Sequence, residues 1–119
     1  MNEQEINARL AALVEAVKQS EISRRFEAAE AELAKDPKLE EEVDHFRRKR
    51  FELSMSDEDR LIAEQNKLQD DYRNIFMKIP AAKEFLESEM DYCRLVRRIK
   101  EEFHDECKID ISFLNDSRS

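Results

Sequence analysis

Apolar residues between positions 80 and 107 recur at alternating steps of three and four. That spacing places side chains along one side of an α-helix. The members of this stripe are Ala82, Phe85, Tyr92, Val96, Ile99 and Phe103, with Glu89 at the one step where an apolar residue is missing. Pro80 suits the first turn of such a helix, because its nitrogen would have no intrahelical partner there. The pattern predicts one long amphipathic helix over Pro80–Cys107.

Four earlier segments show the same helical periodicity, over residues 3–19, 20–35, 37–53 and 57–79. Between the first two, Ser20 or Ser23 can cap a separate helix; equally, the first helix can continue through with a bend. Asp36-Pro37 predicts a clear boundary, because a proline disfavours helix at the residue before it and fits well at the first turn of the next helix.

The segment over 57–79 has its seam in strict alternation of four and three, as in a coiled coil. The seam positions are Leu61, Gln65, Leu68, Tyr72, Ile75 and Ile79. We therefore expect an all-α bundle of four to five helices, with a long C-terminal antiparallel hairpin formed by residues 57–79 and 80–107. One domain should cover residues 1–114, and residues 115–119 should form a disordered tail.

The period changes after Cys107. Ile109, Ile111 and Phe113 alternate with polar residues, which is a strand-like pattern. No partner strand is apparent in the sequence, so we expect an extended arm that docks on the bundle or on a second subunit.

The amino-acid composition disfavours several classes of function, which limits the functions to consider. Charged residues make up 42% of the 119, glycine is absent, and the formal net charge is −8. A chain without glycine lacks the usual means of building phosphate-binding loops or a nucleophile elbow, so we expect no enzyme activity. The acidic balance disfavours a nucleic-acid partner. The sequence shows no membrane span and no signal peptide, so we expect a cytoplasmic protein with no membrane partner.

Two patterns in the sequence, besides the cysteines, are candidates for chemistry. Two Glu-x-x-His pairs, Glu42 with His45 and Glu101 with His104, match part of a di-iron pattern, but His45 and Glu101 lie off the apolar stripes. Basic runs at 47–50 and 97–100 have acidic neighbours at helical spacing, which is typical of solvated faces with intrahelical ion pairs. We therefore assign no metal ligand and no cofactor to these groups.

Cys93 and Cys107 are the only cysteines, too few for a disulfide framework. We interpret both cysteines as small buried hydrophobic residues with free thiols. The alternative is a metal- or iron–sulfur-binding helical oligomer that uses Cys93 and Cys107 from several chains, because residues 14 apart on one helix lie about 21 Å apart.

A second apolar flank beside the main stripe favours a binding role. Leu86, Met90 and Cys93 form this flank, and a helix that is apolar over so much of its circumference must be covered on two sides. The cover is either a second copy or another protein, or else the tail of the same chain. Candidate interface residues are Leu86, Met90, Cys93, Ile111 and Phe113.

Two stretches resemble the YlbF/YmcA family of small bacterial proteins. One is Ile79-Pro80, Glu84-Phe85, Ser88 and Met90, followed by Leu95 and Ile99; the other is the run over residues 26–31 followed by Leu33 and Asp36. The resemblance spans about residues 6–109. It implies a helical, non-catalytic regulator that forms homo- or hetero-oligomers and supports biofilm formation, competence and sporulation.

The resemblance also implies partners. Family members form complexes with paralogues and act with ribonuclease Y in mRNA processing. Such complexes carry iron–sulfur clusters held by cysteines, several of them in C-terminal tails. This chain has no cysteine after Cys107, so no cysteine ligand transfers to a matching position.

Overall fold

Helices form nearly all of the chain in the computed structural model, which describes the backbone of residues 1–55 and 58–116 and the side chains of residues 1–55 and 62–114. The order is α1 (Glu3–Lys18), α2 (Glu21–Ala34), α3 (Pro37–Ser54), α4 (Glu58–Asn74), the short 3-10 helix η1 (Phe76–Lys78), α5 (Pro80–Cys107) and α6 (Phe113–Asp116). No strand occurs in the described part. The all-α prediction is therefore confirmed, and the strand-like period after Cys107 does not produce a strand there.

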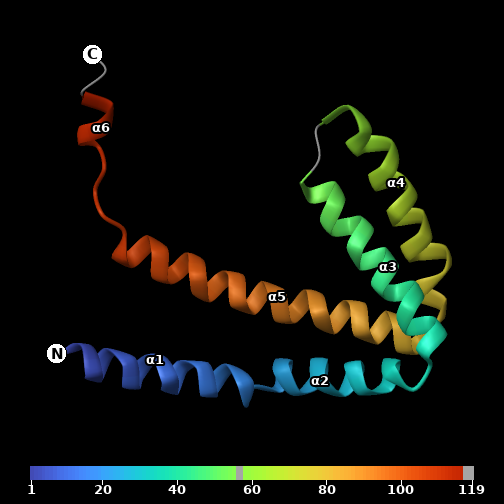
Figure 1. Cartoon of the computed structure of the whole chain (residues 1–119), viewed down its shortest axis with the longest axis horizontal. Coiled ribbons are helices and arrows are strands. Elements are labelled where there is room, and N and C mark those ends of the chain that lie inside the picture. Colours follow the sequence, from blue (N-terminus) through green and yellow to red (C-terminus); the bar gives the residue numbers. More distant parts are fainter. Residues whose placement is uncertain (56–57, 117–119) are drawn as a thin grey trace.

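The break between α1 and α2 is made by two serines. Ser20 caps α2 by accepting a hydrogen bond from the backbone N–H of Ser23 at 3.2 Å. Ser23 in turn donates its hydroxyl to the Val17 carbonyl oxygen at 2.6 Å, which satisfies an acceptor at the end of α1. The first two helices are thus separate, although they run nearly end to end (Figure 1).

The predicted boundary at Asp36-Pro37 is confirmed. The Asp36 carboxylate accepts a hydrogen bond from the Leu39 backbone N–H at 3.2 Å, and Pro37 is the first residue of α3. The break expected between the segments over 37–53 and 57–79 lies partly outside the described residues, because nothing is described for 56–57.

The described residues of α4 and α5 do not pair as the predicted long C-terminal hairpin. Instead α4 packs against α3, and α5 runs along α2 (Figure 1). The chain changes direction because α4 ends at Asn74, η1 intervenes, and Ile79 is extended at φ −108° and ψ 106°. An extended residue before Pro80 is expected from the steric clash that proline imposes on its predecessor.

The core lies where α2, α3, η1 and the first half of α5 meet. Its buried residues are Ala29, Leu33, Leu39, Val43, Phe46, Phe76, Ala82, Phe85 and Leu86. Phe76, rather than the seam residue Ile75, enters the core, because the α-helical period stops at Asn74. The predicted seam position Leu61 lies outside the described side chains.

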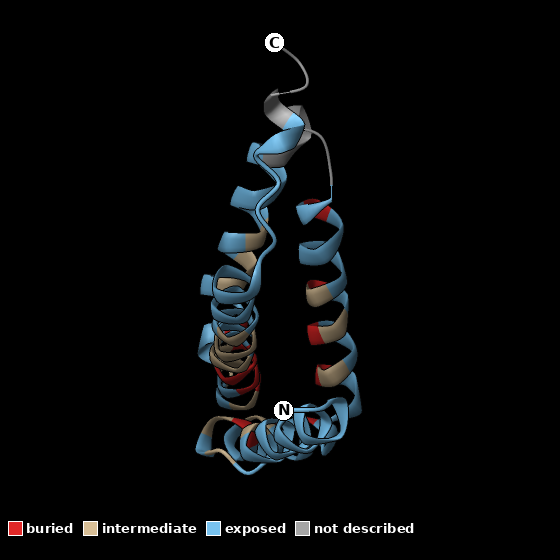
Figure 2. Cartoon of the chain, turned by 90° about the vertical axis from the view of Figure 1, so that its left-hand side faces the viewer, coloured by how far each residue is buried: buried red, intermediate tan, exposed pale blue. Residues whose placement is uncertain are grey.

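The rest of the molecule is open. Figure 2 shows α1 and the segment leading to α6 exposed, with burial concentrated where the other helices meet. The radius of gyration is 19.5 Å, against about 13.5 Å for a compact domain of this length. The single domain over residues 1–114 stays a prediction. The predicted disordered tail covers residues 115–119, and residues 117–119 lie outside the described residues.

Candidate protein-interaction surface

A buried carboxylate joins α5 to α3. Glu89 is 6% exposed, and its two oxygens lie 2.5 Å from a guanidinium nitrogen of Arg47 and 2.6 Å from one of Arg50. Burial tends to lower the pKa of Arg47, but the Glu89 charge and hydrogen bonds to Asp44 and Glu89 outweigh this, and the pKa is raised.

The same two arginines also cover the core. The Arg47 guanidinium carbon lies 5.0 Å from the centre of the Phe85 ring, and that of Arg50 lies 5.7 Å from the centre of the Phe46 ring. Both distances are within the range of cation–π attraction. Two of the four residues in the basic run 47–50 therefore have structural partners inside the chain.

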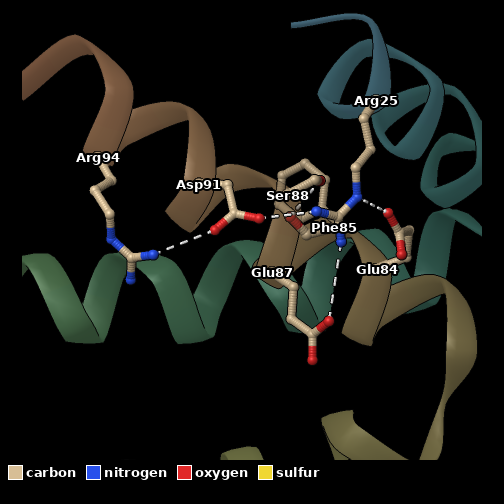
Figure 3. A network of polar contacts seen from close by, with 7 residues as sticks. All are labelled: Arg25, Glu84, Phe85, Glu87, Ser88, Asp91 and Arg94. Carbon is tan, nitrogen blue, oxygen red and sulfur yellow. Dashed lines mark hydrogen bonds and ion pairs between the residues drawn. The ribbon is translucent and has the colours of Figure 1, made fainter. Parts of the chain in front are cut away.

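A second ionic network fastens α2 to α5. Arg25 on α2 pairs with Glu84, with Glu87 at 3.9 Å and with Asp91 at 2.8 Å, and Arg94 reaches Asp91 at 3.5 Å (Figure 3). The hydrogen bond from Arg25 is the main cause that holds the pKa of Glu84 below its ordinary value, and burial opposes it. All these side chains are well exposed, so each pair contributes little.

We expect Arg25→Gln to lower the free energy of unfolding by about 1 kcal/mol at about pH 7. The folded pKa of Glu84 lies below its ordinary 4.5, so the stabilisation is complete above pH 4.5 and is lost as the pH falls through the lowered value. Urea unfolding of both proteins at a series of pH values measures the difference. Arg9→Gln, an exposed change on α1, serves as the control. A difference that does not decrease as the pH is lowered below 4.5 would contradict the role given to Glu84.

The candidate interface residues separate into two groups. Leu86 is fully buried within the chain, because α5 packs there against both α2 and α3. Met90, Cys93, Ile111 and Phe113 are exposed. The tail therefore does not cover the second flank in this structure, and Leu86 is a core residue rather than an accessible interface residue.

The candidate metal ligands are dispersed. In the described residues no three His, Cys, Asp or Glu side chains come close enough to hold a metal ion. Both Glu-x-x-His pairs are exposed. Both cysteines are free and exposed, so the prediction that they are buried is wrong. A charged cleft of about 890 Å³ lies between α3 and α4, with His45, Arg48 and Lys49 among its lining residues.

Two apolar faces have no extended cover among the described residues. On α1 the stripe residues Ile6, Leu10 and Leu13 are exposed, Val17 is half-buried, and α1 packs against the neighbouring α2. On α5 the stripe continues past the core, and Phe103 is 70% exposed. Helical periodicity in the sequence predicts that each of these helices has an apolar face. Periodicity alone does not show whether the same chain covers that face.

The described helices include none that is both long enough and apolar enough to cross a membrane.

Neither a search of curated proteins nor a search of solved structures gave a significant match. A sequence profile described as "Control of competence regulator ComK, YlbF/YmcA" matches residues 6–106, from α1 almost to the end of α5. The match includes every helix of the core, and the chain therefore belongs to the YlbF/YmcA family of regulatory proteins.

Proposed function

We propose that this chain is a non-enzymatic regulatory adaptor that acts by binding other proteins, with family paralogues and ribonuclease Y as its partners. In this role it supports competence, biofilm formation and sporulation through mRNA processing in the cytoplasm. The observation that carries the proposal is the open shape of the chain. The radius of gyration is 19.5 Å, and the chain leaves exposed several amphipathic helix faces, which a compact monomer would cover.

The absence of catalysis is supported by how the reactive side chains are placed. Both histidines and both cysteines are exposed on helix surfaces, and His104 Nδ1 lies 3.7 Å from a carboxylate oxygen of Asp105. A nucleophilic site needs a nucleophile within hydrogen-bond reach of a base. Among the described residues no such pair with a cysteine or serine accompanies either histidine.

The alternative function is that of a metal- or iron–sulfur-binding oligomer using Cys93 and Cys107. Their exposure is compatible with ligation shared between chains, whereas their separation along α5, about 21 Å, prevents both from binding one ion in a single chain. Iron content and visible absorbance of protein prepared without oxygen distinguish this alternative from the adaptor.

The adaptor role is tested with two purified probes, a YlbF/YmcA paralogue from the same genome and the cytosolic part of ribonuclease Y. We expect wild-type protein to bind at least one of them in biolayer interferometry, with a Kd of about 10 μM or below. Met90→Asp and Phe113→Asp should weaken that binding at least about tenfold.

The matched controls are Met55→Asp and Phe51→Asp, which place the same changes at exposed positions on and after α3. They should bind as the wild type does. The proposal fails if neither probe binds the wild-type chain, or if the Met90 and Phe113 variants bind no more weakly than their controls.

A further inference from the structure

We propose that the C-terminal arm of this chain, residues 109–114, docks into an apolar groove with a basic rim on another protein. The acidic last turns of α5, just before the arm, speed the encounter with that rim. The inference deepens the proposed function and rests on its premise that the chain acts by binding proteins. It names the segment that enters the partner and the chemistry of the partner's surface.

The arm exposes large apolar side chains in close succession. Ile109 is 82% exposed, Ile111 is 60% exposed and Phe113 is 62% exposed. Figure 1 shows the segment after α5 running apart from the other helices and ending in α6. Exposed apolar side chains gathered in one place mark an interaction site, whereas single ones scattered over a surface do not.

Two hydrogen bonds hold the arm in a turn. The backbone N–H of Ser112 donates to a carboxylate oxygen of Asp110 at 2.9 Å. The backbone N–H of Leu114 donates to the carbonyl oxygen of Ile111 at 3.0 Å. An aspartate that accepts from the backbone two residues further on is a common way to hold a turn. A segment that already has one shape loses less conformational entropy when it binds, which suits the arm to docking.

The segment that carries the arm is strongly acidic. The last two turns of α5 have four exposed acidic residues, Glu101, Glu102, Asp105 and Glu106. Asp110 follows within the arm, and Lys108 is the one lysine or arginine in residues 101–114. These residues therefore contain half of the chain's formal net charge of −8. A surface complementary to this segment is apolar at its centre and basic around it.

The same charge favours another protein over this chain as the owner of the groove. The large cleft between α3 and α4 does not offer a basic rim, because more glutamates and aspartates than lysines and arginines line it. A second copy of the chain also has a formal net charge of −8, which repels an acidic segment. The occupied groove is therefore assigned to a protein with a basic surface.

The place of the arm in the sequence supports a role in choosing the partner. The family profile matches residues 6–106, so the arm begins after the part of the chain that the profile describes. A segment outside the shared helices can give one family member a partner that other members bind weakly, because specificity is a difference between affinities. We therefore assign the choice of partner to the arm.

The apolar contacts are tested by binding to the two purified probes named above, the paralogue and the cytosolic part of ribonuclease Y. The triple variant Ile109→Ser/Ile111→Ser/Phe113→Ser keeps every charge of the arm. It should weaken binding to whichever probe the wild type binds about 100-fold or more, because the apolar side chains that fill the groove are gone.

A matched triple variant serves as the control for lost apolar surface. Phe51→Ser/Met55→Ser/Ile62→Ser removes three apolar side chains that are 65%, 76% and 71% exposed, on and beside α3 and on α4. It should bind as the wild type does. Circular dichroism checks that both triple variants stay helical.

The basic rim is tested by the association rate constant at about 50 mM salt. Glu101→Gln/Glu102→Gln/Asp105→Asn/Glu106→Gln should lower it about tenfold and remove most of its dependence on salt. The control Glu27→Gln/Glu30→Gln/Glu41→Gln/Glu42→Gln removes as many charges at exposed positions on α2 and α3, and should stay within about twofold of the wild type. Equal rates for the two quadruple variants would overturn the basic rim.

The remaining outcomes separate the arm from the adaptor role. If Met90→Asp weakens binding to a probe but the triple arm variant binds as tightly as the wild type, only the role of the arm is wrong. If neither probe binds the wild-type chain, both proposals are overturned. Sedimentation equilibrium tests a second copy as the owner of the groove. A wild-type dimer that the triple arm variant does not form would overturn the assignment to another protein.

Discussion

Replacing Leu86 by Asp should unfold the chain. The Leu86 side chain is fully buried where α5 packs against α2 and α3. Truncating such a residue to alanine costs about 2–5 kcal/mol, and burying an unpaired carboxylate in its place costs more. The total is comparable to the whole stability of an ordinary domain, about 5–15 kcal/mol. Loss of the helical signal at 222 nm, or a sharply lowered urea midpoint, is the expected result.

Met90→Asp provides the matched control, because it introduces the same charge one turn further along α5 at an exposed position. It should keep its helical content and its urea midpoint close to the wild type. If Leu86→Asp were as stable as Met90→Asp, the packing described for the second flank would be wrong. The comparison thus separates a core residue from a surface residue on one face of one helix.

The double variant Arg47→Ala/Arg50→Ala should lower the free energy of unfolding by about 2–4 kcal/mol. It leaves the Glu89 carboxylate without either of its ion-pair partners and removes both cation–π contacts. The cost is below that of isolating a deeply buried charge, because removing two half-exposed side chains admits water to Glu89. Urea unfolding monitored by circular dichroism measures it.

Two further variants test the cause. Arg48→Ala/Lys49→Ala removes the same number of charges from the same basic run, at exposed positions, and should change stability by less than about 0.5 kcal/mol. Adding Glu89→Leu to the double arginine variant should recover most of the lost stability, since the carboxylate is then absent. If the triple variant is no more stable than the double, lost packing by the arginine stems is the cause rather than the stranded charge.

Features set by neighbouring residues could be predicted from the sequence. The cap at Asp36, the start of α5 at Pro80 and the helical periods all depend on contacts within a few residues, and the structure has them where expected. The partner of α5 could not be predicted in this way. Every helix here is amphipathic, so the periods of α2 and α4 are equally compatible with α5, and the path of the chain through η1 decides between them.

Glu89 shows why part of the site escaped prediction. Helical spacing placed it on the buried stripe, but a polar residue there appeared only as an interruption. Its role depends on two arginines about forty positions earlier, and that distance along the chain conveys no periodic signal. The basic run over 47–50 likewise has the spacing of a solvated face, although Arg47 and Arg50 pair with Glu89.

The charge at Glu89 also fixes how α3 is aligned along α5. A slide of one helical turn, about 5.4 Å, would carry the carboxylate away from both guanidinium groups while leaving apolar side chains free to find new apolar neighbours. Leucine at this position would tolerate several such alignments at similar energy. A glutamate paired with two arginines tolerates only one alignment. The ion pairs at Glu89 therefore also fix the angle between the α3–α4 hairpin and the rest of the molecule.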